Sequence, residues 1–402
     1  MSVLTRLTCT AYGTHFADQI ALVLVPLTAA LAFDVPPLII GLLVACQSMA
    51  HLLGSIPFGI LVDQRQPRLL AKASALMSLC GFGLAAFSTF TGTLALFAFA
   101  ITCAGFGVVL FGLTALSILP RSVPPRDLAK ANAAIEVPRA LSSFAVPLAV
   151  GLTVGLVPIW TLFAIACAGS AFALSHAYRL PNFDVAPKQS EPALSRIITG
   201  GRYVLRHRLL LPISLCAVFW NYGFAALLVV LVPAIQTLFA FHPGSFGIAL
   251  AAFGLAALCG TLLAGRIAHL VEPSTLLIFG PGSSALATVG LLAIGPETAT
   301  LWLYGCFFLL GVGPAMWLIT QNAVRQMVTP ADMLGRVNAV IQTTIYGIRP
   351  LGAVAGGAVA GMAGAQTGRY LVVLAFACSA AVPLLSDLRK VRRYDTLSPT
   401  AA

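Results

Sequence analysis

The stretch Val123–Glu136 reads VPPRDLAKANAAIE, and a related stretch, Val328–Gln342, reads VTPADMLGRVNAVIQ. When Gly335 is treated as one extra residue, Val, Pro, Asp, Asn, Ala and Ile recur in step. The two copies lie 205 residues apart before Gly335 and 206 after it, about half of the 402-residue chain. Each copy is a short polar loop that enters a long apolar helix. A half-chain duplication in so apolar a chain is typical of a transporter built from two parallel halves.

The composition predicts a polytopic membrane protein. Hydrophobic residues make up 59% of the chain and charged residues only 9%, whereas a soluble domain has roughly 25% charged residues. Strand-like alternation is absent, and the apolar runs are long enough to span a membrane as helices. The fold class that we expect is therefore an all-α membrane protein rather than a barrel.

The positive charge indicates topology rather than a nucleic-acid partner. The net charge is +11, and we place 20 of the 23 Lys and Arg residues, Arg325 among them, in alternate loops and the termini. Arg369 is placed in a loop on the opposite side, and Arg139 and Arg349 inside helices. This bias predicts a multi-pass protein of the bacterial inner membrane with both termini in the cytoplasm. The nine cysteines are scattered and form no CxxC pair, so we expect no disulfide framework, metal site or cofactor.

Twelve membrane spans fit the apolar runs, six on each side of a polar link. The predicted boundaries are 1–180 for the first six-helix half, 181–208 for a cytoplasmic link, 209–388 for the second half and 389–402 for a cytoplasmic tail. The last two spans are expected at 338–363 and 366–386. We also expect a short surface helix at Leu194–Leu205, and disorder in the tail after Asp387.

The first predicted span contains three polar residues, His15, Asp18 and Gln19. An ionised Asp at the middle of a membrane costs about 3 kcal/mol on insertion scales, so Asp18 should face a partner or a wet cavity. His15 and Asp18 are three residues apart and share a helical face. They form either a protonatable pair that couples transport to a proton gradient or a structural hydrogen bond between helices.

The loop at 59–68 reads GILVDQRQPR and resembles the Gly-x-Leu-x-Asp-Arg-x-Gly-Arg-Arg loop of the major facilitator superfamily. The resemblance implies twelve helices in two pseudo-symmetric halves that alternate between inward-open and outward-open states. Gln64 stands where the superfamily has an Arg, and Arg65 follows it. The resemblance and the duplicated loops together suggest a conformational latch made of Gly59, Asp63, Arg65, Arg68, Asp127, Asp332 and Arg336.

Two more charged sites lie inside predicted spans. Glu136 and Arg139 are three residues apart, so they can pair with each other or with Asp18. Arg349 lies about 16 Å into its predicted helix. Because an Arg cannot lose its charge there, it needs a carboxylate, from Asp18 or Glu136, or an anionic solute. The sequence around Arg349, QTTIYGIRPLG, resembles the exporter branch that includes macrolide efflux proteins and the enterobactin exporter.

Aromatic and amide side chains beside these charges suit a cavity for a bulky, partly apolar solute, although ordinary helix packing explains the aromatics equally well. The predicted substrate-binding residues are Arg349, Arg139, Gln19, Trp220, Asn221, Tyr222, Trp317, Gln321 and Tyr346. The predicted proton-coupling residues are Asp18, His15 and Glu136.

The leading hypothesis is a secondary active transporter that exports an amphipathic organic compound, drug-like or siderophore-like, in exchange for protons. The first alternative is import or exchange of a small organic anion bound through Arg349. A non-transporting receptor or a lipid scramblase stays open as a third class. An enzyme is not expected, because no HExxH, Gly-x-Ser-x-Gly or phosphate-binding loop is present. The expected partners are a small-molecule substrate, protons and membrane lipid, and the resemblance implies a monomer.

Overall fold

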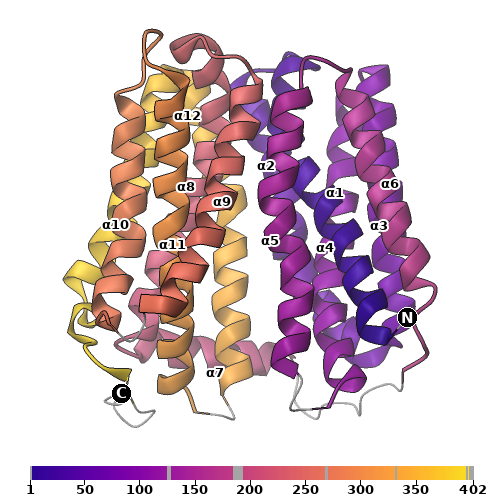
Figure 1. Cartoon of the computed structure of the whole chain (residues 1–402), viewed down its shortest axis with the longest axis vertical. Helices are drawn as coiled ribbons and strands as arrows, with labels where there is room; N and C mark the ends of the chain where they lie inside the picture. The colour runs from indigo at the N-terminus through magenta and orange to yellow at the C-terminus, as the bar shows by residue number, and fades with distance from the viewer. Residues whose placement is uncertain are drawn as a thin grey trace. The chain divides into compact units, whose positions relative to one another are not determined.

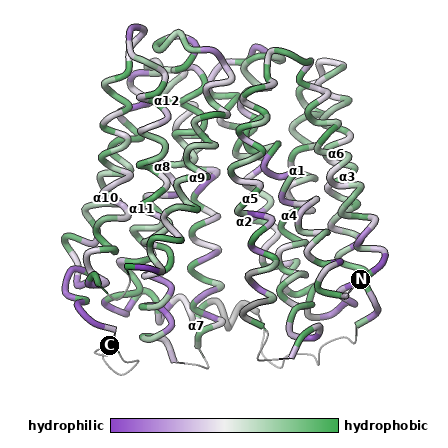
Figure 2. Tube along the Cα trace, viewed as in Figure 1, coloured by the Kyte–Doolittle hydropathy of each residue, from purple (hydrophilic) through white to green (hydrophobic). Residues whose placement is uncertain are grey.

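A computed structural model describes residues 2–124, 128–183, 193–267, 270–330, 333–394 and 397. Within these ranges the chain is helical, apart from one isolated bridge between Val154 and Val157. The predicted fold class is therefore confirmed. Figure 2 shows hydrophobic colouring along most of each long helix. Eleven of the helices in these ranges are long and apolar enough to cross a membrane.

The first six helices precede the link predicted at 181–208, α7 lies within it, and the others follow it (Figure 1). The first set is α1 (Val3–Leu31), α2 (Pro37–Gln64), α3 (Pro67–Thr91), α4 (Leu94–Ser122), α5 (Leu128–Thr153) and α6 (Ile159–Ala177). The second set is α7 (Ala193–Arg206), α8 (Leu210–Ala234) with the π-turn η2 (Ile235–Phe239), α9 (Gly244–Ile267), α10 (Pro273–Leu292), α11 (Thr300–Val328), α12 (Leu334–Leu385) and the short η3 (Asp387–Lys390). The helix α7 matches the surface helix expected at Leu194–Leu205.

The longest helix, α12, is two membrane spans joined at a glycine. Its 52 residues would reach about 78 Å as one straight helix, far more than the roughly 30 Å of a bilayer's hydrocarbon core. Gly364 has φ 85° and ψ 160°, a conformation that a residue with a Cβ rarely adopts. The break falls between the spans predicted at 338–363 and 366–386, so the described chain holds twelve spans.

The internal contacts divide the chain into two compact units, Met1–Ser190 and Glu191–Ala402, with the segment Phe246–Ala251 of α9 grouped with the first. We call them the first half and the second half. The duplication detected in the loops extends over the helices of both. The helices α1 to α5 start 206 or 207 residues before α8 to α12, respectively.

Packing repeats along with the helix positions. A Cβ added to Gly105 of α4 would meet Gln47 O and the Ala50 Cβ, both at 2.9 Å. A Cβ added to Gly311 of α11 would meet Phe253 O at 2.5 Å and the Ala256 Cβ at 3.1 Å. Glycine is required at both places because a backbone of the neighbouring helix approaches this closely. Each of these three positions in the second half lies 206 residues after its counterpart in the first.

Three expectations about polar segments are wrong. Arg369 is not in a loop but in the second segment of α12, and Arg325 is not in a loop but inside α11, where both side chains are buried. The segment after Asp387 is not disordered throughout, because Leu388 and Val391 are buried against the second-half core. Ser274 N at the start of α10 also donates to Val391 O at 2.8 Å. Apolar residues spaced among the basic ones of this tail explain its docking.

The helix α7 lies across the ends of the second-half spans (Figure 1). It is held there by Gly200, which packs on the backbone of Arg336, and by Tyr203, whose hydroxyl donates to Val328 O at 2.9 Å. Burial raises the pKa of Tyr203. His207 follows α7, and its Nδ1 accepts the N–H groups of Leu209 and Leu210 at 3.1 and 3.3 Å. This histidine therefore caps the start of α8.

Candidate functional site

In the first half, α1 and α5 bring charged and titratable side chains together. Glu136 and Arg139 form the pair that their spacing predicts, with Arg139 Nη2 2.6 Å and Nε 2.7 Å from Glu136 Oε2. His15 of α1 lies within electrostatic range of both. Its ring makes an edge contact with Phe111, with the ring centroids 6.0 Å apart. Because α1 packs against α5, His15 lies near enough to feel both charges of this pair, although 121 residues separate it from Glu136 in the sequence.

The exposure of these side chains indicates that they face water rather than lipid. The side chains of Arg139 and Glu136 are 57% and 60% exposed, although both lie in a predicted span. Contact with lipid tails would be costly for either charge. Asp18 and Gln19 are partly buried one turn further along α1. This face of the first half therefore brings together an acid, an imidazole and a solvent-exposed ion pair.

In the second half, α8 and α12 build a different polar contact. Arg349 Nε donates to Asn221 Oδ1 at 2.9 Å, and the guanidinium carbon lies 5.0 Å from the centre of the Tyr346 ring. Asn221 is buried, and its Nδ2 donates to Ala217 O at 2.9 Å. That bond fixes the orientation of the amide, so that its oxygen points to Arg349. The guanidinium is thus held by an amide and an aromatic ring.

Two of the aromatic residues predicted to bind substrate, Trp220 and Tyr222, have different surroundings. The Trp220 indole stacks on Phe224 with the centroids 5.0 Å apart, and its N–H donates to Ser284 Oγ at 3.0 Å. Tyr222 lines an apolar pocket of about 370 Å³ between α8 and both segments of α12, together with Phe219. A pocket of this volume fits a drug-sized apolar group. Trp220, in contrast, already has a hydrogen-bond acceptor for its indole N–H and a stacking partner for its ring.

The helix α11 carries a polar ladder that the sequence analysis recognised only in part. Trp317, Gln321 and Arg325 follow one another at four-residue intervals and lie on one helical face. Gln321 and Arg325 are only 3% and 8% exposed. Asn322 Oδ1 accepts from Gln321 Nε2 at 2.6 Å and from Arg325 Nη2 at 2.7 Å. Arg325 was missed as a site residue because it was assigned to a loop. Its four-residue spacing from Gln321 would have placed both on one helical face.

Comparison with known proteins places this arrangement in a family. A sequence model of the Major Facilitator Superfamily matches residues 7–353. The chain belongs to the major facilitator superfamily. Enterobactin exporter EntS of Salmonella typhi is 27% identical over 307 residues, which cover 75% of this chain and 72% of that relative. EntS of Escherichia coli O127:H6 gives the same identity and coverage. The predicted family is confirmed, and it is a family of transporters rather than enzymes.

Solved structures of this superfamily show the same fold at low identity. A POT family transporter in complex with 5-aminolevulinic acid matches with a TM-score of 0.79 and 12% identity, over 97% of this chain and 96% of that one. The nucleoside transporter NupG matches with a TM-score of 0.76 and 14% identity, over 96% and 98%. At this identity the likeness extends to the fold alone.

The superfamily loop between α2 and α3 is only partly described. Arg68 Nη2 donates to Tyr178 O at 2.8 Å and Nη1 to Asn182 Oδ1 at 3.0 Å, so this arginine caps the end of α6. Arg65 ends α2, and a Cβ on Gly59 would meet nothing within 4 Å. Asp127 and Asp332 lie outside the described residues, as does the side chain of Asp63. Arg336 Nη1 lies 3.8 Å from Met333 Sδ at the start of α12.

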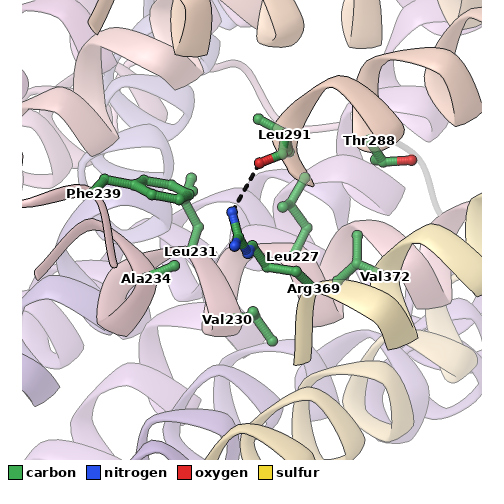
Figure 3. Close-up of a pocket in the computed structure, with 9 residues that line it drawn as sticks. All are labelled: Leu227, Val230, Leu231, Ala234, Phe239, Thr288, Leu291, Arg369 and Val372. Carbon is green, nitrogen blue, oxygen red and sulfur yellow. Dashed lines mark hydrogen bonds between the residues drawn. The ribbon is translucent and has the colours of Figure 1, made fainter. Parts of the chain in front are cut away.

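Arg369 is a second buried arginine of the second half. It binds helix ends on the side opposite to α7. Its Nη1 donates to Leu291 O at 2.9 Å and to Ile294 O at 3.3 Å, at the end of α10. The guanidinium also lies 5.1 Å from the centre of the Phe239 ring. Figure 3 shows it reaching from α12 toward Leu291 past a cavity of about 10 Å³. This cavity is too small for a substrate, so the role of Arg369 is to hold helix ends together.

Proposed function

We propose that this protein is a secondary active antiporter that exports an amphipathic organic compound, drug-like or siderophore-like, in exchange for protons. It would work as a monomer in the bacterial inner membrane, with both termini in the cytoplasm, and alternate access to its substrate site by movements of the two halves. The likeness to enterobactin exporters supports the direction and the substrate class. The wide range of organic compounds that this class includes also covers multidrug export.

The observation that carries the proposal is the cluster on α1 and α5. His15 lies beside the Glu136–Arg139 pair, and Asp18 follows on the same helix. Intramembrane acids near an imidazole are the groups that proton-coupled transporters use. In our proposal Asp18, with His15 or Glu136, takes up the proton. The movement of charge on this face of the first half then changes which state of the transporter is favoured.

A test measures proton movement in vesicles that contain the purified protein, with an imposed pH gradient and a panel of amphipathic compounds. Asp18→Asn keeps the shape of the side chain and removes its charge. The variant should stay folded, and its rate of compound-driven proton movement should fall about 100-fold or more, because the proposed proton carrier is lost. Asp34→Asn, which makes the same change at an exposed acid after the end of α1, is the matched control and should couple like the wild type. Unchanged coupling in Asp18→Asn would rule out the role of α1 and move attention to Glu136.

A second candidate function, import or exchange of a small organic anion, is favoured by one observation in the second half. Arg349 is held in its own half by the Asn221 amide oxygen and the Tyr346 ring, and a permanent cation at this depth suits the binding of an organic anion. Uptake of a labelled organic anion that is lost in Arg349→Gln and is independent of the pH gradient would favour this function over proton-coupled export.

A further inference from the structure

The end of each half where the duplicated loops lie is closed by one apolar core, and the two cores are built at equivalent positions. One core includes α1, α3, α4 and α5, and the other includes α8, α10, α11 and α12. Five pairs of buried residues, each 206 residues apart, belong to both: Leu7 and Ile213, Ala71 and Leu277, Ile118 and Val324, Ala131 and Val337, and Ile135 and Ile341. The two halves therefore pack the same positions at this end. A position that is apolar in one half and polar in the other is then a candidate for a functional difference.

The difference lies on a single helical face. In the first half, α4 places Phe111, Ala115 and Leu119 in the core, with exposures of 1%, 3% and 3%. At the positions 206 residues later, α11 carries Trp317, Gln321 and Arg325. An indole, an amide and a guanidinium thus stand in the second half where the first half has three apolar side chains, although the surrounding helices are equivalent. The ladder extends about 12 Å along α11, because its ends are eight residues apart.

Each member of the ladder has a buried polar atom without a partner among the described residues. These atoms are Trp317 Nε1, Gln321 Oε1 and Arg325 Nε. A buried polar group without a hydrogen bond is destabilising, and a buried charge without a counter-charge is more so. The one partner that the structure gives Arg325 through a side chain is Asn322, a neutral amide. The second-half spans supply no carboxylate. The N–H donors of Trp317 and Arg325 and the acceptor oxygen of Gln321 are therefore available to a ligand.

We propose that Trp317, Gln321 and Arg325 form a subsite for the acidic group of the transported solute, which is therefore an organic anion with a carboxylate or phenolate oxygen. This inference rests on the proposed transport function and narrows its substrate class. Arg325 donates to the anionic oxygen, Gln321 accepts from a neighbouring hydroxyl or amide, and the Trp317 N–H and indole face bind a more distant part of the solute. The subsite is closed in this structure. Arg325 lies three residues from the end of α11 nearest α7, the side from which an exported compound would enter in the proposed orientation.

The test uses calorimetric titration of the purified full-length protein with naphthoate and with its neutral analogue naphthamide, without a pH gradient. The variants Arg325→Leu and Gln321→Ala place the residues of the first half at the equivalent positions of the second, so the fold should be retained. We expect Arg325→Leu to weaken naphthoate binding about 10-fold or more and to leave naphthamide binding unchanged. Arg325→Lys, which keeps the charge, should still bind naphthoate more tightly than naphthamide. Arg266→Leu, which removes an exposed arginine at the last turn of α9, should match the wild type.

Thermal unfolding separates a ligand-binding role from a structural one. If Arg325 only stabilised the fold, Arg325→Leu would lower the unfolding temperature. We expect it to raise that temperature, because it removes a buried charge that has no counter-charge among the described residues. The proposal fails if the wild type does not prefer naphthoate, or if Arg325→Leu keeps that preference. Should Arg325→Leu not fold, Gln321→Ala and Trp317→Phe decide the same question. Because no proton gradient is used, these outcomes do not depend on whether transport is proton-coupled.

Discussion

Where the first half buries Phe111, Leu119 and Phe163, the second half has Trp317, Arg325 and Arg369, each 206 residues later. Both arginines are buried, and Trp317 is partly buried. The helices around these positions start in register, and the glycines that permit close packing recur with equivalent neighbours. The backbone design is therefore common to both halves. Polar and charged groups have been placed in each half separately, and they are where the two halves can differ in function.

The placement of acids shows the same division. The helices α1, α2 and α5 of the first half contain Asp18, Asp63 and Glu136, respectively, whereas the helices α8 to α12 of the second half contain no Asp or Glu and bury Arg325 and Arg369. A protonatable acid suits the coupling of proton movement, and a permanent cation suits the binding of an anion. The comparison thus supports a division in which the first half handles protons and the second half handles the solute.

The largest expected effect tests the common backbone. Gly105→Leu and Gly311→Leu should each destabilise the protein by roughly 4 kcal/mol or more, because the new side chain would collide with the backbone of the neighbouring helix. Gly112→Leu on α4 and Gly305→Leu on α11 are the matched controls, since a Cβ at either position meets nothing within 4 Å. Yields of folded protein and unfolding temperatures measure the effect. A large loss in only one half would contradict the equivalence of their packing.

A smaller effect is expected where the two halves differ in how a helix ends. In the first half, α3 ends at Gly92 with φ 71°, and the N–H of Gly92 donates to Ser88 O, a left-handed glycine cap. In the second half, α10 ends at Ala293 in a right-handed conformation, and Arg369 donates to its last carbonyl groups. The Arg369 guanidinium therefore caps the C-terminus of α10, as Gly92 caps the C-terminus of α3.

Arg369→Phe gives the second half the residue that the first half has at Phe163. We expect a loss of about 2 kcal/mol in the free energy of unfolding, because Leu291 O and Ile294 O at the end of α10 lose the charged donor that Arg369 supplies. Hydrogen exchange should accelerate locally at residues 291–299. The control is Phe163→Leu, which should leave the end of α3 protected because its cap does not use that side chain. Equal protection of residues 291–299 in Arg369→Phe and the wild type would show that Arg369 is not the cap.

Most of the backbone could be predicted from the sequence, because hydrophobic length and the repeated loops report directly on spans. The break at Gly364 fell between two predicted spans for that reason, and the three-residue spacing of Glu136 and Arg139 gave their ion pair. Burial of single charges could not be predicted. Arg325 and Arg369 each lie near a helix end, where a charge is normally solvated, so a count of loop charges assigned both to loops. The contact of Arg349 with Asn221 joins residues 128 positions apart, which no local pattern shows.

The smallest expected effect concerns His207, which has no counterpart in the first half because it follows the linking helix α7. Its neutral ring accepts two backbone N–H groups through Nδ1, so the proton of the ring is on Nε2. Burial and the neighbouring Arg208 lower the pKa of His207. Protonation would place a hydrogen on Nδ1 and remove the cap of α8. The folded state therefore favours the neutral ring.

The sign of the pH dependence follows from that preference. Above about pH 6.5, the usual pKa of histidine, the ring is neutral in both states and makes no pH-dependent contribution. As the pH falls below this value, the unfolded chain binds a proton before the folded protein does, so the free energy of unfolding decreases until the lowered pKa of the folded state is reached. Thermal unfolding at pH 7.5 and pH 5 should show this loss in the wild type. His207→Asn keeps an acceptor that does not titrate, and it should reduce the difference between the two pH values. An unchanged difference in His207→Asn would assign the acid sensitivity to another group and leave the cap of α8 without a role in it.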